Sequence, residues 1–297
     1  MSLFRTSVRL LARGILTVLA LSATLLTGVA FADEGDDRLD LVRKKGAIEF
    51  VVYRDFPPYS YQVDGAFKGV DVEMGEALAA ALGLKATFKT FIPGDDLDDD
   101  LRNQLWRGTI VGGSVGDVML HVGADPQYVA RQDKVWIFGV YFRETVSLSF
   151  DPKKFPDYSV LEDLEGKRIA VELGSIADLY LTNFNDGALR QSLNRYPSAN
   201  EAVKAFVAGK ADATIAPRGE LQGLLKLNGE NGRASPAQTV QFQGLFRNAW
   251  EIGIAVKRDS PKLRDALADA LATMIENGQL KAIYARHGMD YQTPGLK

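Results

Sequence analysis

The chain has 297 residues, of which 46% are hydrophobic and 25% are charged, and it contains no cysteine. The absence of cysteine excludes disulfides and thiolate metal sites. With 35 basic and 38 acidic residues, the net charge is −3. A surface of this balance lacks the dense basic face that nucleic-acid binding requires.

The first 32 residues have the pattern of a secretory signal peptide. Arg5, Arg9 and Arg13 precede or open an uncharged apolar run over 14–30, and the segment ends in Ala-Phe-Ala. We expect cleavage after Ala32 and a periplasmic location; a membrane anchor is the alternative, since the run approaches the lower limit for a spanning helix. Removing three arginines and no acid leaves 32 basic against 38 acidic residues, a net charge of −6.

Apolar periodicity predicts alternating strands and helices after the leader. The first block reads as helix 36–45, strand 48–53, a turn-rich loop 55–65, helix 70–82 with Gly83 as its stop, strand 85–91, helix 95–106 and strand 117–122. Such alternation predicts a parallel sheet with helices on both faces, whose ligands bind beyond the carboxyl ends of the strands.

A second alternating block follows residue 142. It reads as helix, turn and strand over 161–175, helix 198–208, strand 211–216, a surface loop 228–238, strand 250–256 and closing helices after Ser260-Pro261. About 265 residues follow the leader, more than one core usually organises, so two lobes are expected.

Four stretches together carry a family resemblance. They are FVVYRDFPPYSYQVDGAFKGVDVEMGEALAAALG (50–83), RQDKVWIFGVYF (131–142), LEGKRIAVELGS (164–175) and ENGQLKAIYARHG (276–288). In this order they resemble the extracellular solute-binding proteins of family 3, the polar amino-acid receptors of ABC importers. The resemblance implies an α/β type II periplasmic-binding fold: two lobes, each with a mostly parallel central sheet flanked by helices, joined by a two-strand hinge. Lobe 1 would comprise 33–142 and 250–297, and lobe 2 would comprise 143–249.

A narrower resemblance concerns DLRNQLWRGTIVGGSVGDVMLHVGADP (100–126), which is similar to a subgroup encoded beside quinoprotein alcohol or methanol dehydrogenases. It implies pyrroloquinoline quinone (PQQ) in place of an amino acid as the ligand, or an accessory role for such a dehydrogenase. The family resemblance implies a monomer that captures a small solute by hinge closure and delivers it to an ABC permease in the inner membrane. Neither a required cofactor nor a metal ion is implied.

The family resemblance also places aromatic residues against the ligand. Alignment on Pro58-Tyr59 puts Phe56 in the ligand-facing position of the first loop, with Tyr53 at the end of the preceding strand. A planar face suits either an aliphatic side chain or a stacked quinone. The alternative is that Phe56 fills the core of its own loop.

Two residues of lobe 1 are predicted to face an anionic group. Arg131 lies six residues before Ile137, the spacing at which the family places its carboxylate-binding arginine, and a guanidinium binds a carboxylate through two hydrogen bonds. An exposed helical arginine is the alternative. His121, at the carboxyl end of a strand, is interpreted either as a hydrogen-bond donor to a ligand oxygen or as a core histidine.

Lobe 2 completes the predicted site. Gly174 and Ser175 open a helix whose N-terminus suits an anion, although Ser175 as a simple helix cap is equally compatible. In KADATIAPRGE (210–220), Pro217 stands where the family's amino-acid receptors carry an aspartate for the ligand's ammonium, and Arg218 follows. The loss of an acid and the gain of a base predict a cleft for a carboxylate-rich ligand.

A third hypothesis is an enzyme of the periplasmic dehydratase kind. It would need an acid or base in the cleft, and Glu172 and Glu220 are the only candidates that the sequence offers. Because no nucleophile and base are paired in a recognisable motif, we predict that the protein is not an enzyme.

Overall fold

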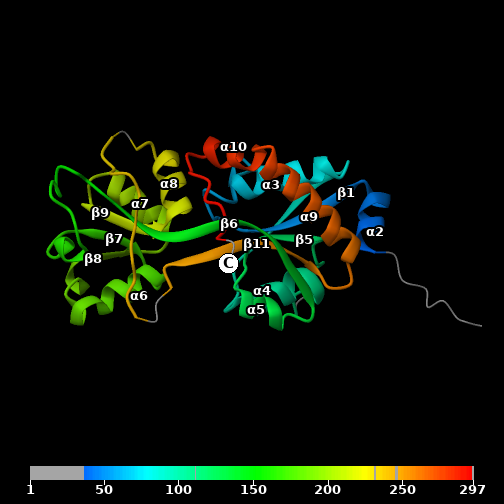
Figure 1. Ribbon diagram of the computed structural model, residues 1–297, viewed down its shortest axis with the longest axis horizontal. Coiled ribbons are helices and arrows are strands. Elements are labelled where there is room, and N and C mark those ends of the chain that lie inside the picture. Colours follow the sequence, from blue (N-terminus) through cyan, green and yellow to red (C-terminus); the bar gives the residue numbers. More distant parts are fainter. Residues whose placement is uncertain (1–36, 111, 231, 245–246, 296–297) are drawn as a thin grey trace, which may run out of the picture. The chain divides into compact units, whose positions relative to one another are not determined.

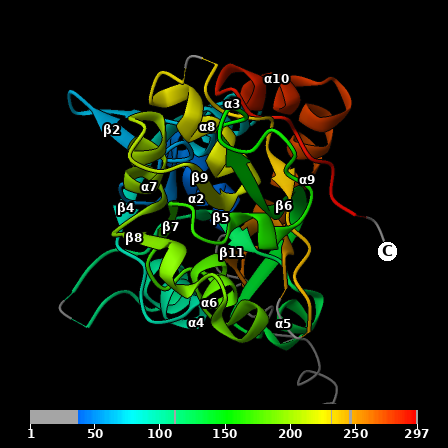
Figure 2. The ribbon, with the colours of Figure 1, turned by 90° about the vertical axis from the view of Figure 1, so that its left-hand side faces the viewer.

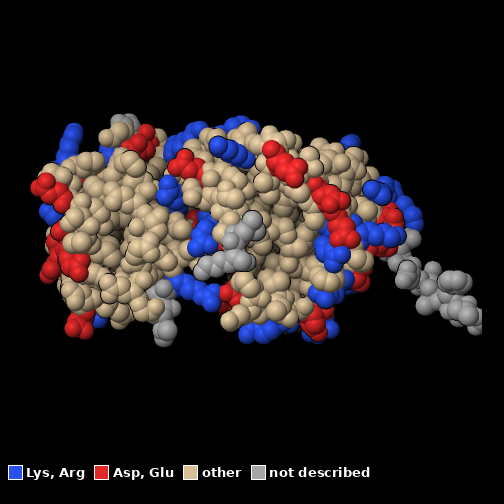
Figure 3. All heavy atoms as spheres, in the orientation of Figure 1, with Lys and Arg blue, Asp and Glu red and all other residues tan. Residues whose placement is uncertain are grey.

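The computed structural model describes residues 37–110, 112–230, 232–244 and 247–295. The predicted signal peptide, its alternative as an anchor and the cleavage site after Ala32 lie outside the described residues, so they stay predictions. Within these ranges, no helix has both the length and the apolar character that crossing a bilayer requires. On the face shown in Figure 3, basic and acidic side chains are interspersed, in keeping with the small net charge.

The first alternating block and the last two helices build one lobe (Figure 1). Its elements are α2 (Arg38–Lys45), β1 (Ala47–Tyr53), α3 (Val70–Ala81), β4 (Lys85–Phe91), α4 (Leu97–Leu101), a π-helical turn (Arg102–Trp106), β5 (Val118–Gly123), α5 (Pro126–Arg131), α9 (Pro261–Glu276) and α10 (Gln279–Arg286). β1 pairs in parallel with β4 and β5. One buried apolar cluster includes α3, α9 and α10, and another includes α4 and the π-helical turn. Helices therefore cover both faces, as the alternation predicts.

The second block builds the other lobe, which faces the viewer in Figure 2. Its elements are β7 (Ile169–Glu172), α6 (Ile176–Asn183), β8 (Leu193–Tyr196), α7 (Ala199–Val207), β9 (Ala213–Pro217) and α8 (Arg218–Leu227), with 3-10 turns at Leu161–Leu164, Phe184–Gly187 and Arg190–Ser192. β7 pairs in parallel with β8 and β9. α6 packs into one buried cluster, and α7 and α8 pack into a second one.

Two long strands connect the lobes. β6 (Val135–Phe150) pairs antiparallel with β11 (Ala249–Lys257) as far as Thr145, and with β9 from Val146 onward. The short β10 (Gln238–Thr239) also pairs with β6. The strand order is β4-β1-β5-β11-β6-β9-β7-β8. The predicted fold, two lobes joined by two strands, is confirmed, whereas the predicted boundaries at 142 and 249 lie in or beside these strands and stay predictions.

Two lobe 1 segments differ from the sequence-based expectation. The loop predicted over 55–65 runs into a hairpin of β2 (Tyr61–Val63) and β3 (Ala66–Lys68). The helix predicted over 95–106 divides into α4 and the π-helical turn. Short strands and π-turns leave little periodicity in a sequence, so both escape pattern analysis.

Helix α8 is not predicted from the sequence, because Gly219 and Gly223 lower its helix propensity. Tertiary packing explains both glycines. A Cβ on Gly223 would lie 2.4 Å from Cγ of Pro58, and a Cβ on Gly219 would lie 2.5 Å from the hydroxyl of Tyr59. The close approach of α8 to the loop after β1 therefore requires residues without a side chain.

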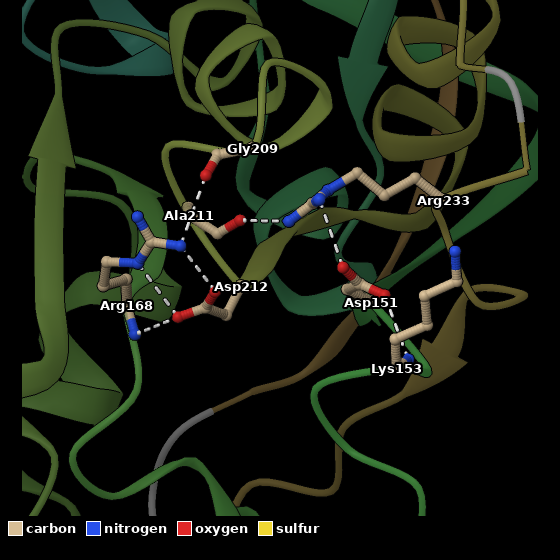
Figure 4. A network of polar contacts seen from close by, with 7 residues as sticks. All are labelled: Asp151, Lys153, Arg168, Gly209, Ala211, Asp212 and Arg233. Atoms are coloured by element: carbon tan, nitrogen blue, oxygen red, sulfur yellow. Dashed lines mark hydrogen bonds and ion pairs between the residues drawn. The ribbon is translucent and has the colours of Figure 1, made fainter.

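A network of charged groups joins strand ends in the second lobe (Figure 4). Arg168 donates from Nη2 to Oδ1 of Asp212 at 2.6 Å and from Nε to Oδ2 at 3.0 Å. Arg233 forms an ion pair with Asp151 at 3.1 Å and donates to the carbonyl of Ala211 at 3.0 Å. The guanidinium of Arg168 holds the pKa of Asp212 below its usual range. We call Arg168, Asp212, Arg233 and Asp151 the paired network.

Candidate functional site

A pocket of about 400 Å³ lies at the carboxyl ends of the parallel strands of both lobes. Tyr53 and Gly123, which end β1 and β5, line it on one side, and Glu172 and Pro217, which end β7 and β9, line it on the other. Ligands of parallel sheets bind at this edge, and the volume lies within the range of small-molecule sites. We call this space the binding pocket.

Aromatic rings form the lobe 1 wall of the binding pocket. Phe56 lies 5.1 Å from Tyr59 and 5.8 Å from Tyr53 between ring centroids. The hydroxyl of Tyr53 donates to Oδ2 of Asp100 at 3.3 Å, which fixes this ring in place. The structure thus brings the predicted Tyr53 and Phe56 together in the pocket. Phe56 also packs against the lobe 1 core, as its alternative predicts, and its contact with a ligand stays a prediction.

His121 reaches the binding pocket from an irregularity in β5. Its φ is +59°, a left-handed conformation that histidine adopts more readily than most side chains. The register between β5 and β11 shifts between Gly253 and Ala255, opposite this residue, as expected for a bulge that redirects a side chain. Behind the pocket wall, Nδ1 of His121 lies 3.4 Å from Oδ2 of Asp71, whose side chain is fully buried. A donor role toward a ligand stays a prediction.

Three glutamates converge on the binding pocket: Glu144 of β6, Glu172 at the end of β7 and Glu220 in the first turn of α8. Glu144 accepts hydrogen bonds from the hydroxyl of Tyr59 and, at 3.2 Å, from the amide of Gly219. Burial raises the pKa of all three carboxyl groups. We call Glu144, Glu172 and Glu220 the acidic trio.

Little positive charge balances the acidic trio. The side chains of Glu172 and Glu220 form neither a hydrogen bond nor an ion pair with any residue in the described ranges. The only arginine or lysine in the described lining is Arg54, which is half exposed and lies 3.8 Å from Asp55. The described residues also include no cluster of three or more His, Asp or Glu suited to a metal ion. Among the described residues, the lining of the pocket thus carries more acidic than basic side chains.

Arg131 lies outside the binding pocket. It is the exposed last residue of α5 and lines a separate hollow beside Asp98, Arg102 and Tyr128. The structure therefore gives no support to the predicted carboxylate grip and agrees with the alternative, an exposed helical arginine. The spacing to Ile137 could not reveal this, because it does not determine which side of lobe 1 the end of α5 faces.

The predicted anion site of lobe 2 is also absent from the described lining of the pocket. The hydroxyl of Ser175 accepts from the amide of Asp178 at 3.2 Å, and the amide of Gly174 donates to Oδ2 of Asp178 at 3.0 Å. These groups cap α6. Arg218 lies beside the lining residues but turns to Asp290, at 3.6 Å. The base that was expected to attract a carboxylate is therefore not among the described lining residues, and its buried Nε has no hydrogen-bond partner among them.

The sequence reasoning missed the charge of the pocket. Pro217 does stand in the lining, but the acid missing at that position is supplied three residues later by Glu220. Glu172 ends a strand and Glu220 follows the end of another by three residues, and the sequence had named both as acid or base candidates without weighing their effect on the charge of the pocket. Glu144 offers a weaker signal, a single acid in the buried part of a long strand.

Comparisons with known proteins agree with this architecture. The sequence profile of the bacterial extracellular solute-binding proteins, family 3, matches residues 48–107. The L-cystine-binding protein TcyJ of Escherichia coli (strain K12) is 23% identical over 269 residues, covering 89% of this chain and 91% of TcyJ. The arginine-binding protein 1 of the same organism's ABC transporter is 25% identical over 238 residues, covering 80% and 88%.

Solved structures share the fold. An ancestral cationic amino acid solute-binding protein superposes with a TM-score of 0.67 at 20% identity, covering 84% of this chain and 99% of that one. The two lobes, the connecting strands and the superposition define a type II periplasmic-binding fold. In sequence, the chain is similar to the bacterial extracellular solute-binding proteins of family 3 over residues 48–107 and to curated binding proteins over most of its length.

Proposed function

We propose that the protein captures a small amino acid that carries a second positive charge, such as arginine or lysine, and delivers it to an ABC permease. One observation carries the proposal: the acidic trio lines a single pocket of about 400 Å³. A buried negative group needs a cation or a proton, because an isolated buried charge is very costly. A guanidinium or ammonium group of the ligand meets that requirement.

The rest of the lining accommodates an amino acid. Phe56 offers an apolar face to an aliphatic stem. The N-terminus of α7, with Ser198 and Asn200, also lines the pocket, and backbone amides at such an end favour a carboxylate. Arg54, on the lobe 1 side, is a second partner for the carboxylate. The opposed charges would fix the ligand's orientation.

The names of similar proteins support an amino-acid ligand. They include binding proteins for cystine, for arginine and for cationic amino acids. Delivery follows from hinge closure: the open lobes bind the solute, and the ligand shifts the equilibrium toward a closed form that docks on the permease. We place this cycle in the periplasm, with an exported chain that begins at Asp33, which N-terminal sequencing of the purified protein tests.

A carboxylate-rich ligand such as PQQ is the competing proposal. The acidic trio opposes it, because like charges repel in a site of low dielectric constant. The accessory role for a quinoprotein dehydrogenase is a separate proposal that needs no ligand. It predicts co-purification with the dehydrogenase and no stabilisation by any solute.

An enzyme remains a second candidate because of one observation: Glu172 and Glu220, the acid and base candidates of the sequence, both line the pocket. Raised pKa values are common to catalytic acids and to buried binding groups. Analysis of the bound compound by NMR after long incubation separates the two. A binding protein returns the ligand unchanged.

Isothermal titration calorimetry tests the proposal with L-arginine, L-lysine, L-cystine, L-glutamate and PQQ. We expect saturable binding of arginine or lysine, at least about 100-fold tighter than that of glutamate. A buried charge partner can strengthen or weaken binding by about this factor, according to the sign of the ligand's charge. Tighter binding of glutamate or PQQ would contradict the proposed ligand class. Failure of all five to bind would remove the support for solute capture of this kind.

A further inference from the structure

Glu220 is a buried acid that faces the binding pocket without a partner. It is 7% exposed, and its carboxyl group forms neither a hydrogen bond nor an ion pair with any residue that the structure describes. The neighbouring amide of Gly219, in the first turn of α8, donates to Glu144 instead. A cavity wall thus contains a group that needs either a proton or a cation.

The groups around Glu220 add negative charge. Glu172 faces it from β7 and Glu144 from β6, and Tyr59 approaches from lobe 1 with its hydroxyl bonded to Glu144. The remaining titratable groups of the described lining are Tyr53, Arg54, Asp55 and His121. Burial raises the pKa of Glu220, and the charges of Glu172 and Glu144 raise it further. In the empty pocket these carboxyl groups do not all ionise together.

We infer that the binding pocket exchanges a proton for its cation: Glu220 carries the proton when the pocket is empty, and an incoming guanidinium or ammonium group replaces it. This inference rests on the proposed function. The proton passes from the carboxyl group to the solvent, and the carboxylate left behind pairs with the ligand, so the charge of the pocket is conserved. Binding therefore strengthens as the pH rises, and acid favours release of the ligand.

Titration calorimetry with L-arginine in buffers of different ionisation enthalpy counts the protons released. Arginine is the suitable probe because its guanidinium stays charged at every accessible pH, so near neutral pH the proton must come from the protein. We expect release of about one proton per arginine, and an affinity that falls by up to about tenfold per pH unit on the acid side.

Two variants test whether Glu220 is the group that releases the proton. In Glu220→Gln, a neutral isostere, we expect weaker arginine binding, no proton release and a flat pH profile. Glu165→Gln removes an exposed glutamate of the same lobe and should retain both the proton release and the pH dependence. Circular dichroism and urea unfolding check that Glu220→Gln folds, which we expect because the change removes a buried acid.

The outcomes separate this inference from the proposed function. If the unaltered protein binds arginine without releasing a proton, or if Glu220→Gln still releases one, the exchange is wrong while cation capture stands. If neither arginine nor lysine binds at any pH, the proposed ligand class fails first. If Glu220→Gln does not fold, the pH profile of the unaltered protein decides, and a flat profile overturns the exchange.

Discussion

The acidic trio and the paired network show two contrasting uses of acidic side chains. In the paired network, Asp212 receives three hydrogen bonds from Arg168, one of them from its backbone amide, and its pKa is lowered. In the acidic trio, Glu172 and Glu220 have no such partner among the described residues, and their pKa values are raised. The first group stabilises the fold by itself. The second contains buried carboxyl groups that need either a proton or a cation.

The largest expected effect is the loss of arginine affinity when the charges of Glu172 and Glu220 are removed. The double variant Glu172→Gln/Glu220→Gln should bind arginine about 100-fold more weakly, because truncating a buried charge partner costs about 2–5 kcal/mol. Calorimetry measures the affinity, and Glu165→Gln serves as the matched control. Arginine affinity within about threefold of the unaltered protein would mean that the acidic trio does not hold the cation.

Removal of one charge from the paired network should act on stability and not on binding. We expect Asp212→Asn to lower the free energy of unfolding by about 1 kcal/mol, since Arg168 loses a charged acceptor but is itself half exposed. Urea unfolding measures the change, with Asp157→Asn, an exposed aspartate of the same lobe, as the control. A loss of arginine affinity would show that the two groups are coupled.

The two groups should also give stability opposite dependences on pH, each smaller than the effects above. The raised pKa of Glu220 contributes stability that is complete below about pH 4.5 and is lost as the pH rises through the raised value. The lowered pKa of Asp212 contributes stability that is present above about pH 3.8 and is lost as the pH falls through the lowered value. Urea unfolding of Glu220→Gln and Asp212→Asn at a series of pH values measures both contributions to stability. Equal slopes in these variants and the unaltered protein would contradict the contrast.

The smallest effect is expected at Arg131, which belongs to neither group. Arg131→Ala should leave arginine affinity within about twofold, because the residue lies outside the binding pocket and exposed substitutions rarely matter. The sequence-based role as a carboxylate grip predicts instead a loss of more than about tenfold. The same calorimetric titration decides between the two.

Local sequence patterns predict much of the architecture. The alternation of strands and helices and the start of α9 at Pro261 follow from periodicity and from helix-start signals. These features depend on residues close to one another along the chain, so a single sequence contains them. The family resemblance implied that two strands connect the lobes, and the pairing of β6 with β11 confirms this connection.

Tertiary structure decided the charge of the binding pocket. Glu144, Glu172 and Glu220 come from three separate elements, and only folding shows that they meet while Arg131 and Arg218 turn elsewhere. The bulge that aims His121 depends on the register of β11. Burial and neighbouring charge, which set the pKa of Glu220, are properties of assembled surroundings. The sequence alone therefore predicted a ligand site at the strand ends, and the three-dimensional arrangement changed the expected charge of that ligand from negative to positive.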